Sequence, residues 1–220
     1  MLKTNLKWEE IIIVVNRKKL FNNEELAFQG VTKDQELVDA IMHNIDMHYK
    51  SMRRGNEKDP TPKTRNAEIN TDFKQPIPYI VIRRGNELFV TERLEGAGEG
   101  RLHGKLSLGA GGHMNPLDSD MFSFHRVLIE NTERELEEEL EIITGNEAFP
   151  KVIGLINDDS EPVSKVHIGI LGIIDLSEGD TVTVRETEQL AGSWISLDDL
   201  KSKEVYDRLE NWSKIVVDIL

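Results

Sequence analysis

Glutamates crowd one short stretch of this chain, where seven of the twelve residues from 130 to 141 are glutamates. In a helix of 3.6 residues per turn, Glu135, Glu138 and Glu139 would share one face, because the last two follow the first by three and four positions. Like charges at this spacing repel by about 0.2–0.5 kcal/mol per pair. A hard divalent cation such as Mg²⁺ would remove that repulsion and gain the oxygen ligands that it prefers. The pattern indicates a metal-binding helix face, with an ordinary solvated acidic face as the alternative.

A pair of glycines, Gly111 and Gly112, comes earlier in the chain, after a predicted short strand over 105–108. Glycine lets the backbone approach a ligand closely, so the Gly111 carbonyl could join the carboxylates around a cation. A plain tight turn is the alternative for a lone Gly-Gly pair. The combination of strand, glycine loop and glutamate helix is rarer than its parts and favours the metal site.

The segment Arg134-Glu135-Leu136, followed by Glu138 and Glu139 and preceded by Gly112, resembles the signature of the Nudix hydrolases. That signature runs Gly, five residues, Glu, seven residues, then Arg-Glu-apolar-x-Glu-Glu-x-Gly-apolar. The resemblance implies an α/β/α sandwich around a mixed sheet over residues 76–220. It also implies hydrolysis of a diphosphate bond in a nucleoside-diphosphate-type substrate, assisted by Mg²⁺ or Mn²⁺ on the helix glutamates. The Gly-Gly-His-Met-Asn loop resembles that of a bacterial subgroup of predicted phosphoesterases.

The signature is altered in its first half. Asp118 stands where the family has its first Glu, and fifteen residues separate it from Arg134, which is an insertion of eight. Glu130, one turn before Arg134, could pair with that arginine instead. Glu141 replaces the family's Gly, which predicts that the helix continues for another turn.

The reaction needs a carboxylate that takes a proton from the attacking water. Glu135 is one candidate. In related enzymes a glutamate from a later loop does this, which points here to Glu186 or Glu188, with a solvated loop as the alternative. We therefore predict Glu135, Arg134 and Glu188 as the catalytic residues.

A net basic stretch lies between residues 50 and 74, with seven basic residues against four acidic ones. In a chain of net charge −13, such a segment could reach over the site and hold a phosphate, and Arg65 and Lys74 are its candidates. Gly112 and His113 of the glycine loop are the other predicted substrate contacts. An ordinary charged linker and a packing histidine are the alternatives.

Composition limits the partners. With 27 Lys and Arg against 40 Asp and Glu, the chain would repel long nucleic acid, but a cation can still recruit a small phosphorylated ligand. The absence of cysteine excludes disulfides, zinc thiolates and thiol nucleophiles. No apolar run approaches the roughly 18 residues of a membrane helix, and no signal peptide is recognisable, so we expect a cytoplasmic protein. A homodimer is an assembly that the sequence leaves open.

The first 75 residues predict a small α/β extension with a linker. A strand is expected over 10–15, a turn over 16–18, and a helix from Thr32 with Thr32 and Gln35 as a capping box. Residues 53–72 predict a loop. The buried face of the expected helix carries Leu37, Val38, Ile41 and Ile45.

The remaining residues, 76–220, predict the Nudix domain. A hairpin is expected around 84–86, a flexible loop over 95–100, and a helix over 123–143 that Gly145 ends. Further strands are expected over 152–156, 166–174, 181–184 and 194–195. Ser196 and Asp199 predict a capping box before one last helix. The buried stripe of the long helix would contain Thr132, Leu136, Leu140 and Ile143, and that of the last helix Leu209, Trp212, Val216 and Ile219.

Two alternatives to a Nudix hydrolase stay open. Isopentenyl diphosphate isomerase shares the fold but usually needs a catalytic cysteine, which this chain lacks. A non-catalytic Nudix domain that senses a nucleotide would not need to keep three crowded carboxylates.

Overall fold

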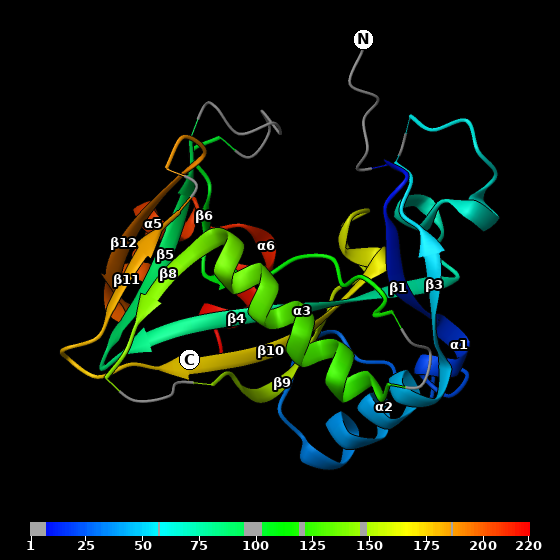
Figure 1. The fold of residues 1–220 in the computed structure, drawn as a ribbon. Coiled ribbons are helices and arrows are strands. Elements are labelled where there is room, and N and C mark those ends of the chain that lie inside the picture. The colour runs from blue at the N-terminus through cyan, green and yellow to red at the C-terminus, as the bar shows by residue number, and fades with distance from the viewer. Residues whose placement is uncertain (1–7, 57, 95–102, 119–121, 146–148, 186) are drawn as a thin grey trace, which may run out of the picture. The chain divides into compact units, whose positions relative to one another are not determined.

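The computed structural model of this chain describes residues 8–56, 58–94, 103–118, 122–145, 149–185 and 187–220 (Figure 1). The chain divides into two compact units that alternate along the sequence. Unit 1 comprises Met1–Pro78, Gly112–Thr132 and Gly154–Ile170, and unit 2 comprises Tyr79–Gly111, Glu133–Ile153 and Leu171–Leu220. The chain passes from one unit to the other within β4 (Phe73–Arg84), between Gly111 and Gly112, and within α3 (Phe124–Glu139), β9 (Lys151–Asn157) and β10 (His167–Asp175). The presence of helices together with β-sheets confirms the predicted α/β class. The predicted division at residue 75, which follows composition, stays a prediction.

Unit 1 is built around one long helix and short antiparallel pairings. Its remaining elements are β1 (Ile11–Asn16), α1 (Arg17–Leu20), β2 (Gly30–Thr32), α2 (Gln35–His48), β3 (Tyr49–Arg53) and the 3₁₀ turns η2 (Lys63–Arg65), η3 (Ala67–Ile69) and η5 (Ser164–Val166). Strand β1 pairs with β3 and with the start of β4, and β2 pairs with β9. The apolar face of α2 packs with β1 in one core cluster that includes Val15, Val38, Ile41, Ile45 and Ile168.

Two local predictions in unit 1 are wrong. Helix α2 begins at Gln35 because Asp34, and not Thr32, is its N-cap: Asp34 Oδ1 accepts hydrogen bonds from the backbone N–H groups of Glu36 and Leu37. Thr32 is the last residue of β2. The predicted turn over 16–18 is the one-turn helix α1, which Asn16 caps in the same way.

Unit 2 contains the antiparallel strands β5 (Glu87–Arg93), β6 (Leu106–Ser107), β7 (Gly109–Ala110), β8 (Leu140–Ile143), β11 (Thr181–Val184) and β12 (Leu190–Ser196). It also contains the short helices α4 (Leu197–Leu200), α5 (Lys203–Tyr206) and α6 (Asn211–Val217). The predicted hairpin is confirmed: Arg84 pairs with Glu87, and Gly85 takes the positive φ of +58° that the two-residue turn needs. One core cluster of this unit joins Ile80, Phe89 and Ala110 to Leu136 and Leu140.

The helix predicted over 123–143 is shorter in the structure. Helix α3 ends at Glu139, and Leu140–Ile143 form β8, which pairs with β11 from Val184↔Leu140 to Thr181↔Ile143. The adjacent β-branched residues Ile142 and Ile143 favour a strand once a partner strand is present. The extension predicted from Glu141 and the stop at Gly145 are therefore wrong, and Ile143 is 61% exposed instead of buried.

The predicted last helix is confirmed only in part, because the chain forms the short helices α4, α5 and α6 in its place, and only α6 carries Trp212 and the buried Val216. Leu209 lies in an isolated β-bridge with Leu106, and the Leu106 carbonyl accepts a hydrogen bond from the Glu210 N–H. This pairing interrupts the helix at Leu209. The predicted cap is confirmed, since Ser196 Oγ accepts a hydrogen bond from the Asp199 N–H at 3.1 Å. The expected loop over 95–100 lies outside the described residues. Among the described residues, every helix is too short or too polar to span a membrane.

Candidate functional site

Helix α3 presents the predicted metal-binding glutamates in unit 2. Leu136 lies in the apolar cluster of that unit and anchors the helix, so that the neighbouring glutamates are held at the edge of the packed surface. The Glu135 side chain is 13% exposed, whereas that of Glu138 is 58% exposed. Glu139 is half-buried. The carboxylates of this face therefore differ in solvent exposure, from the largely buried Glu135 to the exposed Glu138.

Arg134 contacts two of these carboxylates. Its Nη2 lies 2.8 Å from Glu135 Oε1, and its Nη1 lies 3.2 Å from Glu138 Oε1. The second of these ion pairs joins residues one helical turn apart. Glu130, the alternative partner considered for this arginine, forms an ion pair with Arg126 one turn earlier. The guanidinium of Arg134 therefore orders two adjacent carboxylates through charge-assisted hydrogen bonds.

Gly111 follows β7 in the same unit. Its φ of +145° is a conformation that residues with a Cβ rarely adopt, which explains the glycine at this position. The preceding Ala110 pairs with Ile80 and shares an apolar cluster with Leu136. The strand end that carries the Gly111 carbonyl and the helix that carries Glu135 thus pack on one core.

The segment before β12 packs against the end of α3. The Arg185 N–H donates to the Glu139 carbonyl at 2.8 Å, and Arg185 Nε donates to the Leu140 carbonyl at 2.9 Å. Glu188 is exposed three residues further on, and Glu186 lies outside the described residues. A cavity of about 400 Å³ opens beside this segment. It is lined by Phe89, Leu94, Val182, Thr183, Val184, Thr187, Leu190, Ala191 and Gly192.

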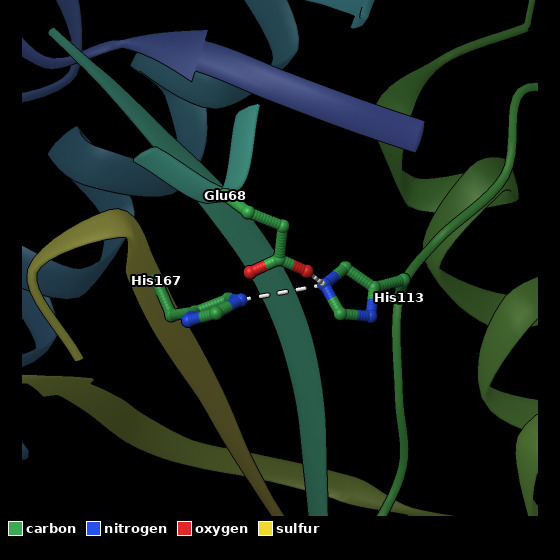
Figure 2. A group of neighbouring side chains, drawn as sticks. All are labelled: Glu68, His113 and His167. Atoms are coloured by element: carbon green, nitrogen blue, oxygen red, sulfur yellow. Dashed lines mark hydrogen bonds and ion pairs between the residues drawn. The ribbon is translucent and has the colours of Figure 1, made fainter. Parts of the chain in front are cut away.

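In unit 1 the structure places His113 in a group that sequence reasoning missed. His113 Nε2 lies 3.3 Å from His167 Nε2 and 3.5 Å from Glu68 Oε1 (Figure 2). Among the described residues, these three form the one group of His, Asp or Glu side chains whose ligand atoms all lie within 4.8 Å of one another. The helix glutamates do not form such a group there, and their joint role as ligands stays a prediction.

His167 has a fixed orientation in this group. Its Nδ1 lies 2.7 Å from the Val163 carbonyl, which can only accept, so Nδ1 carries the proton and the Nε2 lone pair faces His113. Burial lowers the pKa of His167, which favours the neutral ring. Glu68 also accepts a hydrogen bond from Arg54 Nε at 2.8 Å.

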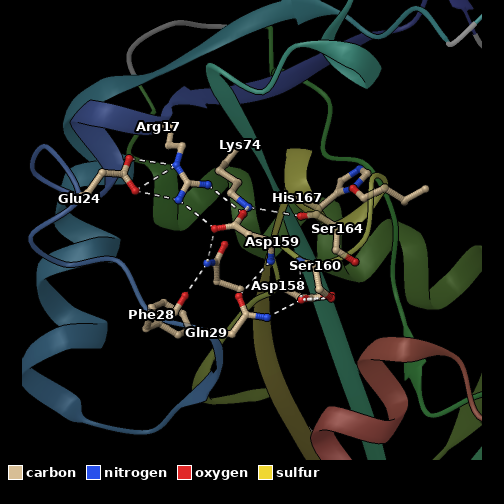
Figure 3. A network of polar contacts seen from close by, with 12 residues as sticks. Arg17, Glu24, Phe28, Gln29, Lys74, Asp158, Asp159, Ser160, Ser164 and His167 are labelled. Carbon is tan, nitrogen blue, oxygen red and sulfur yellow. Dashed lines mark hydrogen bonds and ion pairs between the residues drawn. The ribbon is translucent and has the colours of Figure 1, made fainter.

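The two predicted phosphate contacts, Lys74 and Arg65, differ in their exposure to solvent. The Lys74 side chain has no exposed surface, and its ammonium contacts Asp159 and the Ser164 carbonyl (Figure 3). Arg65 is exposed in η2. Two other arginines of the basic stretch are neutralised, because Arg53 pairs with Glu9 and Asp59, and Arg54 pairs with Glu10 and Glu68. Asp118 is exposed in unit 1, and its role stays a prediction.

No family model matches this sequence. It is 49% identical to Protein YmaB of Bacillus subtilis (strain 168) over 214 residues, which cover 97% of this chain and 98% of that protein. The crystal structure of Tm1382, proposed to be a Nudix hydrolase, superposes with a TM-score of 0.71 and 26% identity, covering 96% of this chain and 97% of that one. The MutT Nudix hydrolase of Burkholderia pseudomallei is 18% identical, with a TM-score of 0.42 over 66% of this chain and 96% of that one.

These findings define the class of protein: the chain has the Nudix hydrolase fold, which it shares with Tm1382, and it belongs to the same family as YmaB. The predicted fold and the predicted resemblance to the Nudix hydrolases are confirmed. The likeness to Tm1382 extends over nearly the whole chain, so it includes most of the first 75 residues, which precede the signature region. It supports a hydrolase. The name of YmaB states no activity.

Proposed function

We infer that the chain is a metal-dependent Nudix hydrolase that cleaves the diphosphate bond of a nucleoside-diphosphate-type substrate. The observation that carries this inference is the contact of Arg134 with both Glu135 and Glu138 on one face of α3. An ordinary acidic face would leave its carboxylates in water, whereas Glu135 is largely covered and held in place. An ordered pair of carboxylates on the signature helix is what a cation-binding face requires.

The donor set fits Mg²⁺ or Mn²⁺. Glu135, Glu138, Glu139 and the Gly111 carbonyl offer only oxygen atoms, which hard cations prefer. When bound, the metal supplies positive charge that offsets the negative charge developing on the diphosphate. Arg134 keeps Glu135 and Glu138 in a fixed arrangement, so that little reorganisation is needed when they bind.

Two glutamates could accept the proton of the attacking water. Glu135 is itself one of the proposed ligands and shares a helix face with Glu138 and Glu139. Glu188 is exposed on a segment that backbone hydrogen bonds fix against the carbonyl of Glu139. A proton acceptor must come within hydrogen-bond reach of the water, and we expect one of these two glutamates to do so once the substrate is bound.

The cavity beside this segment is suited to the organic part of the substrate. Its volume of about 400 Å³ lies within the range of small-ligand pockets. Phe89 supplies an aromatic wall, and Thr183 and Thr187 supply hydroxyl groups. The cavity thus offers an apolar surface with a few polar contacts next to the end of α3.

The direct test is a panel of nucleoside diphosphate derivatives assayed for released phosphate or nucleotide, with Mg²⁺, with Mn²⁺ and with excess EDTA. Activity is expected on one class of the panel and only with metal. Glu138→Gln should reduce the rate by about 100-fold or more. Glu137→Gln, an exposed glutamate of the same helix, is the matched control and should keep the wild-type rate.

The outcomes separate the remaining alternatives. Binding of a nucleotide without turnover would favour a sensor domain and overturn the inference. Full activity in excess EDTA would exclude the metal-dependent mechanism. Isomerisation of isopentenyl diphosphate without hydrolysis of any panel member would also contradict it.

A further inference from the structure

Glu68, His113 and His167 form a compact group of donor atoms in unit 1 that the proposed hydrolysis does not use (Figure 2). Glu68 lies in η3, His113 follows the glycine pair, and His167 is the first residue of β10. Two imidazole nitrogens 3.3 Å apart need either a shared proton or a shared cation between them. The nearby carboxylate of Glu68 would favour a positive charge at that position.

Two of the three separations between the donor atoms match one coordination geometry, and the third is no more than 4.8 Å. Ligands about 2.0–2.1 Å from a tetrahedral metal lie about 3.3–3.4 Å from one another. The two Nε2 atoms are 3.3 Å apart, and His113 Nε2 is 3.5 Å from Glu68 Oε1. Octahedral ligands at Mg²⁺ distances would lie closer, at about 3.0 Å. These two separations therefore fit a tetrahedral site, in which a fourth ligand position would stay open.

The surroundings hold the ligands in place. The Val163 carbonyl accepts the Nδ1 proton of His167, which aims the Nε2 lone pair at the group, as outer hydrogen bonds do in metal centres. Arg54 holds Glu68 at 2.8 Å, and this positive charge opposes a cation. Glu10 offsets it, because its carboxylate lies 2.9 Å from Arg54 Nη1. The side chains of His113 and Glu68 are 17% and 19% exposed, so a metal can enter from solvent.

We propose that Glu68, His113 and His167 bind a divalent transition metal of the Zn²⁺ class. Two imidazoles and one carboxylate select Zn²⁺ over Mg²⁺, since nitrogen donors suit borderline metals and Mg²⁺ prefers oxygen. This site contains none of the helix glutamates, so the proposal can be tested independently of the proposed hydrolase activity.

The experiment is a calorimetric titration of the full chain with Zn²⁺, after removal of metal with EDTA and in excess Mg²⁺ to fill any oxygen-ligand site. The wild type is expected to bind one Zn²⁺ that Mg²⁺ does not displace. His113→Ala should weaken binding by about 100-fold or more. His48→Ala removes an exposed histidine of the same unit and should change nothing, and Glu138→Gln should also keep the site.

A thermal-unfolding series guards against loss of fold. Zn²⁺ should raise the melting temperature of the wild type and of His48→Ala, and should leave that of His113→Ala unchanged. His113→Gln, which keeps a polar side chain of similar size, replaces the alanine variant if that one does not fold. Absence of Zn²⁺ binding by the wild type, or equal binding by His113→Ala and His48→Ala, would overturn the proposal.

Discussion

The Lys74 ammonium lies 2.9 Å from the Asp159 carboxylate, and the Lys74 side chain is completely buried. Arg17 binds the same carboxylate through two nitrogens, so two cations share one anion. Burial disfavours the charged form of Asp159, but the hydrogen bonds from Arg17 and Lys74 outweigh this and hold its pKa well below the usual range. Lys74 therefore stabilises the interior of unit 1, although its place in the basic stretch had suggested a phosphate contact.

Asp159→Asn should destabilise the chain strongly, because it leaves the Lys74 ammonium buried without its carboxylate. Removal of one partner of a buried pair costs about 3–5 kcal/mol, and we expect the lower end since Asp159 is partly exposed. Lys74→Met removes the buried charge itself and should cost less. Urea unfolding of the three proteins measures both changes. A larger loss for Lys74→Met than for Asp159→Asn would contradict this description of the pair.

The same carboxylate predicts a pH dependence. Because the folded-state pKa of Asp159 is below its unfolded value of about 3.9, its contribution is complete above that value and is lost as pH falls through the folded pKa. The stability difference between the wild type and Asp159→Asn should thus be constant near neutral pH and shrink below about pH 4. Unfolding free energies measured from neutral pH down to about pH 3 test this, and a difference that grew on acidification would be inconsistent with it.

Arg134→Gln should lower the catalytic rate strongly but the free energy of unfolding only slightly. The ion pairs of Arg134 are partly exposed, so their loss costs no more than about 1 kcal/mol. Loss of the group that orders Glu135 and Glu138 should reduce kcat by about 10–100-fold. Arg126→Gln breaks an exposed ion pair on the same helix and serves as the control. Equal rates for the two variants would show that Arg134 does not position the carboxylates.

Deletion of residues 1–70 should unfold unit 1. The deletion removes half of the buried residues in its larger core cluster, among them Val15, Phe21 and Ile41. Seven buried side chains at about 1.5–3 kcal/mol each exceed the stability of most domains. Circular dichroism and thermal unfolding of the truncated chain give the answer. A cooperatively folded truncation with wild-type kinetics would show that these residues only decorate the fold.

Local features of the fold could be predicted from sequence. The hairpin turn needs glycine at a positive φ, and the Ser196 cap needs a side-chain oxygen two or three residues before the N–H groups that it binds. The end of α3 could not be predicted this way. Leu140–Ile143 become a strand because β11, some forty residues later, pairs with them.

The glutamate face could also be predicted, because helical spacing brings its residues together. The group of Glu68, His113 and His167 has no such signal, since 54 residues separate the two histidines and only the fold brings them into contact. The burial of Lys74 escapes sequence reasoning for the same reason, as Asp159 lies 85 positions away.

The central claim is that the helix glutamates bind the metal that hydrolysis requires, and Glu139→Gln tests it most directly. Without metal this variant should be as stable as the wild type or more stable by a few tenths of a kcal/mol (about 0.2–0.5), because one repulsive charge is gone. With Mg²⁺ its stabilisation should shrink, since a charged ligand is missing. The rate on an active substrate should fall by about 100-fold or more.

The measurement is a set of melting curves of the wild type and Glu139→Gln, with and without Mg²⁺, together with one rate for each. The predicted result is a smaller Mg²⁺ shift and a strongly reduced rate in the variant. A variant that keeps both the full Mg²⁺ shift and the wild-type rate would contradict the metal-dependent mechanism for this chain.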